Sequence, residues 1–167
     1  MVGLSGSGKS TLARALENTL YEKGYLTQLL DGDNLRTGIN NNLGFSVEDR
    51  VENIRRAAEV SKLFAQCGIV TICSLISPTK GIRDMTREII GGKYFEVFIN
   101  CPIEECEKRD VKGLYAKARR GEIKDFTGIS SPFEAPENPD LEIRTDLKDI
   151  EHCHASLVDA VLEKIEI

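Results

Sequence analysis

Apolar runs rich in strand-forming residues alternate along the chain with stretches whose apolar residues recur at helical spacing. The run 69–76 is continuously apolar, which is typical of a strand buried on both faces. Strands are predicted at residues 25–31, 69–76, 94–100 and 141–146. Helices are predicted at residues 11–24, 47–68, about 79–91, 103–110 and 149–165. This alternation predicts an α/β fold with a parallel β-sheet flanked by helices on both faces.

Polar clusters follow three of these strands, namely DGDNLR, SPTK and NCP. Ligands of parallel sheets bind beyond the carboxyl ends of the strands. We therefore expect the three clusters to converge at one edge of the sheet.

Length and composition narrow the class of protein. The 167 residues suffice for a single domain spanning residues 1–167. The formal net charge of -5 argues against broad binding of nucleic acid. No run approaches the ~20 apolar residues of a membrane span, and no signal-peptide pattern opens the chain. Five cysteines without a C-x-x-C pair argue against a zinc site or a disulfide framework. A cytoplasmic protein is expected.

The stretch Gly3–Ser10 matches the phosphate-binding pattern G-x-x-x-x-G-K-[ST]. Side chains are scarce there because backbone N–H groups must approach a phosphate closely and deliver it to the start of a helix. Lys9 is expected to reach the β- and γ-phosphates, and the Ser10 hydroxyl to ligate Mg²⁺. The alternative is a flexible Gly/Ser turn, which the helix that follows disfavours. The predicted ATP-binding residues of this loop are Gly6, Ser7, Gly8, Lys9, Ser10 and Thr11.

A phosphate loop normally follows a strand, but only Met1 and Val2 precede this one. We expect the first strand to be truncated before Gly3, with most of it outside this sequence. The alternative is that the two residues suffice.

Two carboxylates follow the strand that ends in QLLDGD, some twenty residues after the phosphate loop. No N-K-x-D motif of a guanine-nucleotide switch is present, and this placement suits a small-molecule kinase. Asp31 and Asp33 are two apart at a strand end and are predicted to point the same way. We assign Asp31 to the metal side and Asp33 to the acceptor hydroxyl as candidate base. The alternative is helix N-capping or turn formation.

Several longer segments match one family in order. They are GLSGSGKST, LDGDNLR, NLGFSVEDRVENIRR, LISP, EVFINCP, RDVKGLYAKARRGEI and FTGISSPFEAPENP. The chain resembles the adenylylsulfate kinase (APS kinase) family, which uses ATP and Mg²⁺ to phosphorylate the 3′-hydroxyl of adenosine 5′-phosphosulfate (APS), giving PAPS and ADP in sulfate assimilation. Two positions depart from the family pattern: Leu75, where phenylalanine is usual, and Ser130, where aspartate is usual.

The resemblance implies a P-loop NTPase fold of the nucleoside-monophosphate-kinase type with a mobile lid at about residues 112–130. It also implies ATP and APS as small-molecule partners and a homodimer, and it leaves room for a fused or associated ATP sulfurylase. Within the lid it assigns Lys112 to APS and Arg119 to the transferring phosphates. A surface helix is the alternative for this basic segment.

The acceptor site follows from the same resemblance. Arg36, Arg50 and Asn53 are expected to clamp the phosphosulfate, since guanidinium groups suit its oxygens. Phe45 and Phe126 are expected to stack on the two faces of the APS adenine, the alternative being burial in the core. Arg55 and Arg56 are interpreted as a solvated helix face.

Three further positions complete the predicted site. Ile76 and Ser77 are placed to contact APS through backbone or hydroxyl groups. A phosphorylated Ser77 is conceivable, but no base is evident beside it, so direct in-line transfer is preferred. The segment from Thr145 to Lys148 is where the family holds the ATP adenine, and Lys148 is assigned there.

Two other functions stay open on the sequence. One is a different small-molecule or nucleoside-monophosphate kinase on the same scaffold. The other is a nucleotide-binding module without catalysis that regulates a sulfurylase partner.

Overall fold

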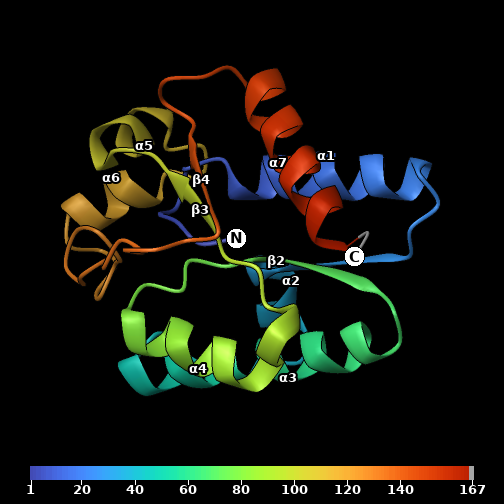
Figure 1. Ribbon diagram of the computed structural model, residues 1–167. Coiled ribbons are helices and arrows are strands. Elements are labelled where there is room, and N and C mark those ends of the chain that lie inside the picture. Colours follow the sequence, from blue (N-terminus) through green and yellow to red (C-terminus); the bar gives the residue numbers. More distant parts are fainter. Residues whose placement is uncertain (166–167) are drawn as a thin grey trace.

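All named strands of the computed structural model pair in parallel, as the alternating pattern predicts, and the structure describes residues 1–165 (Figure 1). Strand β1 (Thr27–Asp31) pairs with β2 (Val70–Ser74), and β3 (Val97–Asn100) pairs with β4 (Leu141–Arg144). Each strand is shorter than predicted by a few residues at its ends. In the first pair Asp31 lies opposite Ser74, so both side chains reach the same carboxyl edge.

The first residues of the chain connect the two pairs of strands. Val2 N donates to Val97 O at 2.8 Å, and Ile99 N donates to Val2 O at 2.8 Å. On the other side, the Met1 amino group donates to Cys73 O at 2.7 Å. Met1 and Val2 thus lie between β2 and β3, where Figure 1 marks the N-terminus. A longer first strand outside this sequence stays a prediction.

Long helices cover both faces of the sheet, as predicted (Figure 1). Helices α1 (Lys9–Glu22) and α7 (Ile150–Ile165) pack on one face, and α3 (Val47–Gln66) and α4 (Lys80–Ile90) on the other. Each face has its own apolar core, centred on Leu16, Leu20 and Leu157 on one side and on Leu30, Ile54 and Ile82 on the other. Full burial of one such side chain contributes about 1.5–3 kcal/mol. The two cores hold the carboxyl edge of the sheet in place.

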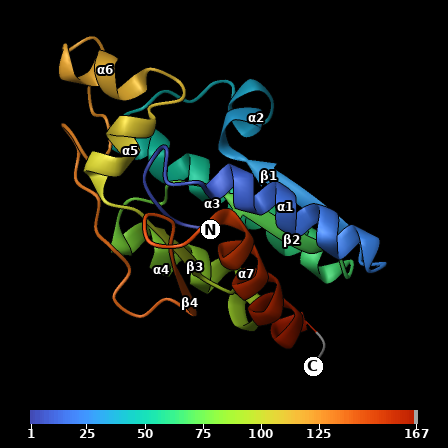
Figure 2. The same cartoon turned by 90° about the horizontal axis from the view of Figure 1, so that it is seen from above.

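Short helices surround the carboxyl edge. They are α2 (Gly32–Thr37), α5 (Ile103–Arg109) and α6 (Leu114–Arg119), and a 3₁₀ turn follows α4 at Gly91–Lys93. Figure 2 shows α2 and α6 projecting from the same side of the molecule. Helix α2 was not predicted, whereas α6 agrees with the surface helix that was the alternative for the basic segment. No helix in the described part of the chain is long and apolar enough to cross a membrane.

Candidate active site

A cavity of about 1040 Å³ opens at the carboxyl edge of the sheet, between the phosphate loop, α2, α3 and the segment predicted as a lid. It brings together most of the residues that the sequence singled out. These are Gly6, Gly8, Lys9, Ser10, Thr11, Asp31, Asp33, Arg36, Phe45, Arg50, Asn53, Ile76, Ser77, Lys112, Phe126 and Lys148. One continuous space therefore joins the predicted ATP residues to the predicted acceptor residues.

The phosphate loop can adopt its path only with glycine at particular positions. A Cβ on Gly3 would lie 2.5 Å from the carbonyl oxygen of Ile99. Gly6 has φ 76°, and a Cβ there would lie 3.1 Å from the carbonyl oxygen of Cys106. The loop is thus pressed against β3 and α5, and it leads into α1 at Lys9. The start of α1 lines the cavity, and the unpaired N–H groups of a helix start stabilise an anion bound beside them.

Lys9 is a nearly buried cation at the floor of the cavity, 8% exposed. Its Nζ donates to Leu4 O at 2.6 Å. Burial lowers the pKa of Lys9 from 10.5 to about 8, and the Cys106 thiol and the Asp31 carboxylate offset this only partly. The groups around Lys9 thus compensate its positive charge only in part, and an anion bound in the cavity would complete the compensation.

Oxygen atoms from three segments gather next to Lys9. Ser10 Oγ donates to Asp31 Oδ2 at 2.8 Å, and it lies 3.2 Å from Ser74 Oγ. Asp31 Oδ1 accepts from Asp33 N at 3.0 Å, so the same carboxylate caps helix α2. The capping interpretation of the Asp pair is thus correct for Asp31, which also faces the phosphate loop.

Asp33 lines the cavity as predicted, but it does so from a helix and not from the end of a strand. The strand ends at Asp31, and Asp33 lies in the first turn of α2. The argument from strand alternation is therefore wrong for Asp33, because the Asp31 cap starts a helix at Gly32. The Asp33 side chain is 71% exposed and forms an ion pair with Lys112 of the predicted lid.

Arg36 and Arg50 surround Phe45 at the acceptor end of the cavity. The Arg36 guanidinium lies 4.2 Å from the centre of the Phe45 ring, and its Nη1 donates to Gly44 O at 2.8 Å. Arg50 Nε donates to Phe45 O at 2.9 Å, and its Nη1 donates to Thr127 Oγ1 at 2.9 Å. Partial burial lowers the pKa of both arginines, which stay far from neutral. Arg50 thus joins the Phe45 loop to the segment predicted as a lid, whereas Arg36 stays on the side of the Phe45 loop.

The two phenylalanines differ in burial. Phe45 is 60% exposed, so the alternative of burial in the core is wrong for this ring. Phe126 is half-buried and packs edge-on against Tyr115, with ring centres 5.0 Å apart. Both rings line the cavity. An exposed aromatic ring in a cavity wall is available to stack on a planar ligand.

The segment 75–78 forms the wall behind α2. Ser77 has φ 45°, which is strained for a residue other than glycine, and Arg83 Nη1 donates to its carbonyl oxygen at 3.2 Å. Within residues 1–165 no side chain hydrogen-bonds to the Ser77 hydroxyl. Leu75 is buried in the core beside Ile54 and Ile82.

Two predicted residues do not line the cavity. Ser7 is fully buried, and its N–H donates to Leu4 O at 3.2 Å. Arg119 lies on α6 and forms an ion pair with Glu107 of α5. The NCP cluster also stays outside: Asn100 Nδ2 donates to Glu142 Oε1 at 2.7 Å, and Cys101 is buried behind the phosphate loop. The carboxyl end of β3 is thus covered by the phosphate loop and α5, whereas β1 and β2 open into the cavity.

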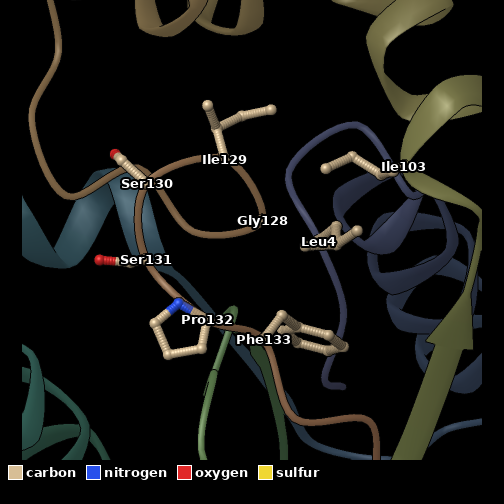
Figure 3. A pocket seen from close by; sticks show the side chains of 8 residues that line it. All are labelled: Leu4, Ile103, Gly128, Ile129, Ser130, Ser131, Pro132 and Phe133. Atoms are coloured by element: carbon tan, nitrogen blue, oxygen red, sulfur yellow. The ribbon is translucent and has the colours of Figure 1, made fainter.

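The loop that carries Phe126 is held from its far side. Figure 3 shows Leu4 and Ile103 beside Gly128. A Cβ on Gly128 would lie 3.0 Å from each of these two side chains, and the three residues line a second pocket of about 470 Å³. Ser130 Oγ accepts a hydrogen bond from Phe126 N at 2.9 Å. The serine therefore supplies an acceptor oxygen at the position where the family usually has aspartate.

Sequence reasoning missed Arg109, which joins three segments at the ATP end. Its Nη2 donates to Thr145 O at 2.7 Å, and its Nη1 donates to Gly6 O at 3.3 Å. Thr145 Oγ1 in turn donates to Ser7 O at 2.8 Å. The only signal was a basic residue at the end of a short helix directly before the lid. Ser74 was also missed, although a hydroxyl at a strand end is a signal of the kind used for Ser77.

Comparisons with known proteins agree with this geometry. The family model described as adenylylsulphate kinase matches residues 1–144. The adenylyl-sulfate kinase of Bacteroides fragilis is 61% identical over 164 residues, which are 98% of this chain and 81% of that protein. The structure of the Mycobacterium tuberculosis APS kinase in complex with AMPPNP and APS is 48% identical, with a TM-score of 0.92 over 96% of this chain and 94% of that one. A hexameric APS kinase from Thiobacillus denitrificans is 32% identical, with a TM-score of 0.68 over 99% of this chain and 27% of that one.

Proposed function

Because the chain belongs to the adenylylsulphate kinase family, we propose that it transfers the γ-phosphoryl group of ATP to the 3′-hydroxyl of APS, giving PAPS and ADP. The observation that supports this most is the single cavity that joins the phosphate loop to Asp33, Arg36 and Phe45. A phosphoryl donor and an acceptor alcohol can meet there without crossing solvent, which is what in-line transfer requires.

At the ATP end, the backbone N–H groups that start α1 and the Lys9 ammonium bind the phosphates. Lys9 has too little negative charge around it in the free protein, so the triphosphate stabilises its charged form. The Thr11 hydroxyl borders the same phosphates, and Lys148 borders the nucleotide base. Arg109 and Thr145 keep the loop in position from behind.

Mg²⁺ fits the oxygen atoms beside the loop. A hydroxyl from Ser10 and a carboxylate from Asp31, 2.8 Å apart, are the ligand types that Mg²⁺ takes in nucleotide sites. Ser10 would hold the ion directly, and Asp31 would hold it through water. The ion would neutralise charge on the β- and γ-phosphates.

At the acceptor end, the 3′-oxygen of APS bonds to the γ-phosphorus of ATP. The bond between the γ-phosphorus and the oxygen of the β-phosphate breaks, and ADP leaves. Asp33 accepts the proton of the 3′-hydroxyl in this step. The ion pair between Asp33 and Lys112 must loosen first, which frees Lys112 for APS. Arg36 and Arg50 exchange backbone carbonyls for phosphosulfate oxygens. Phe45 and Phe126 stack on the adenine, and Ile76 and Ser77 form the wall behind it.

The lid completes the site by moving. Arg119 is bound to Glu107 outside the cavity and reaches the transferring phosphates only when α6 shifts. Closure would expel water and strengthen the charge interactions inside.

A coupled assay of ADP release tests this function. The purified protein with Mg²⁺ and ATP is given APS, AMP, CMP, gluconate or shikimate in turn. We expect turnover with APS and none above background with the others. Equal turnover with another acceptor would assign the chain to a different small-molecule kinase. Binding of ATP and APS without ADP release would make it a regulatory module.

We also propose a homodimer that works in the cytoplasm and associates with an ATP sulfurylase. The hexameric relative supports self-association in the family, and the five cysteines of this chain are all free. Light scattering after gel filtration should give twice the mass of 18.5 kDa. A monomer at micromolar concentration would contradict the dimer.

A further inference from the structure

Asn40 is a fully buried polar residue, 0% exposed, that lies directly behind Asn53 of the cavity wall. It lies in the loop between α2 and α3. Its Nδ2 donates to Asn53 Oδ1 at 3.0 Å and to Asn53 O at 3.3 Å. Its own Oδ1 is the only buried side-chain nitrogen or oxygen within residues 1–165 that lacks a hydrogen-bond partner. Buried polar atoms are normally paired, so this amide is kept at a cost for the sake of its donor group.

The donor of Asn40 determines which way the Asn53 amide faces. The two ends of an asparagine amide have the same shape, so hydrogen-bond partners decide its orientation. Asn53 is 6% exposed and lines the cavity, and its Oδ1 is occupied by Asn40. No residue in the described part of the chain accepts a hydrogen bond from Asn53 Nδ2. The Asn53 NH₂ group is therefore left for a ligand.

We propose that Asn40 is a positioning residue that holds Asn53 with its NH₂ group toward the acceptor. This wall of the cavity then presents donor groups from Asn53, Arg36 and Arg50 and selects a ligand with anionic oxygens. If the Asn53 amide turned over, its carbonyl oxygen would face the same anion and repel it. The inference deepens the proposed function and relies on it for the identity of the ligand.

The backbone of Asn40 anchors its loop independently of its side chain. Asn40 N donates to Leu35 O at 2.9 Å, and Leu43 N donates to Asn40 O at 3.1 Å. Both bonds survive in Asn40→Ala. The variant thus removes the donor to Asn53 and keeps the turn that precedes Phe45.

A double-mutant cycle of Asn40→Ala and Asn53→Ala tests the proposal on the full chain. We expect Asn40→Ala to raise the KM for APS about fivefold to tenfold and to leave the KM for ATP within twofold. Asn53→Ala should raise the KM for APS at least as much. Adding Asn40→Ala to Asn53→Ala should change it by less than twofold, because Asn40 acts through Asn53.

The same Asn40→Ala effect in both backgrounds would overturn the proposal, because Asn40 would then act through the loop and Phe45. An equal rise in the KM for ATP would overturn it too. Asn41→Ala is the matched control, since Asn41 is the exposed neighbour and should change neither KM. If Asn40→Ala does not fold, the cycle is repeated with Asn40→Ser and read in the same way. A wild-type protein that leaves APS unphosphorylated would refute the proposed function instead, before the cycle is begun.

Discussion

The two ends of the cavity differ in how their side chains are held. At the ATP end, Ser7 and Lys9 are buried, and glycines press the loop against β3 and α5. At the acceptor end, Phe45 is largely exposed, and Asp33 and Lys112 form an ion pair between two exposed side chains. The proposed ATP end is thus tightly packed, whereas the charged side chains of the proposed acceptor end are bound to carbonyl and carboxylate groups of the protein.

This difference follows from the kinds of protein groups that form the two ends of the cavity. Backbone amides and a lysine on a packed loop need no rearrangement to meet a phosphate, which is electrostatic preorganisation. The cations at the proposed acceptor end have protein partners that a ligand would replace: carbonyls for Arg36 and Arg50, and a carboxylate for Lys112. We expect substitutions at the ATP end to act on every turnover. Those at the acceptor end should act mainly on APS.

Replacement of Lys9 should have the largest effect. Lys9→Met removes the buried cation beside the phosphate loop and should lower kcat/KM about 10³-fold, in line with the loss of a preorganised charge contact. Initial-rate kinetics with both substrates measures this. Lys23→Met, at an exposed lysine after α1, is the control and should be unchanged. A loss below tenfold in Lys9→Met would mean that the ATP end does not depend on this charge.

Asp33→Asn should come next and act on kcat. Positioned bases contribute ~10²–10⁴-fold, and the loose transition state of phosphoryl transfer favours the lower end, so we expect about a 10²-fold loss. The affinity for ATP, measured by calorimetry with AMPPNP, should stay within threefold. Asp159→Asn on the exposed face of α7 is the control. Near-normal turnover in Asp33→Asn would refute the role of the carboxylate.

The two phenylalanines of the acceptor end differ in burial, so their substitutions should differ in their effect on stability. Phe45→Ala should raise the KM for APS about tenfold or more, since base stacking is worth ~1–3 kcal/mol, with no change in Tm because the ring is exposed. Phe126→Ala should raise the same KM and also lower the Tm, because it loses the contact with Tyr115. Thermal denaturation and APS titration of both variants separate the cases. An unchanged KM in Phe45→Ala would exclude stacking.

The smallest expected effect is a pH dependence at the ATP end. The pKa of Lys9 in the free protein is about 8, and bound phosphates favour its charged form. ATP affinity should therefore fall as pH rises through 8, by about tenfold between pH 7 and 9. The unfolded chain keeps the higher lysine pKa, so this group makes folding more favourable from pH 8 toward 10.5. Calorimetry with AMPPNP should show the fall in wild type and none in Lys9→Met; a flat wild-type profile would contradict the buried lysine.

The sequence predicted the helices and strands well where a long apolar pattern determines them, and poorly where a single contact does. Helices and strands with periodic apolar residues were predicted to within a few residues, because apolar faces decide them. The helix α2 was missed because its start depends on a single cap, in which Asp31 accepts from Asp33 N. The path of the chain past Asp33 changed with it, although the residue still reached the cavity.

The site was predictable where a motif has a local mechanism. The phosphate loop was identified from its glycines and lysine alone. Arg109 and Ser74 were missed, because their roles depend on contacts with Thr145 and Ser10, which are distant in sequence. The exclusion of Arg119 and of the NCP cluster from the cavity likewise follows from tertiary contacts with α5.

The most direct test is to identify the product. Purified protein with Mg²⁺, ATP and APS is incubated, and the nucleotides are analysed by mass spectrometry and phosphorus NMR. The account predicts one PAPS, with its new phosphate on the 3′-oxygen, for each ADP formed. Protein that is folded and binds AMPPNP, but forms no 3′-phosphorylated product from APS, would contradict it.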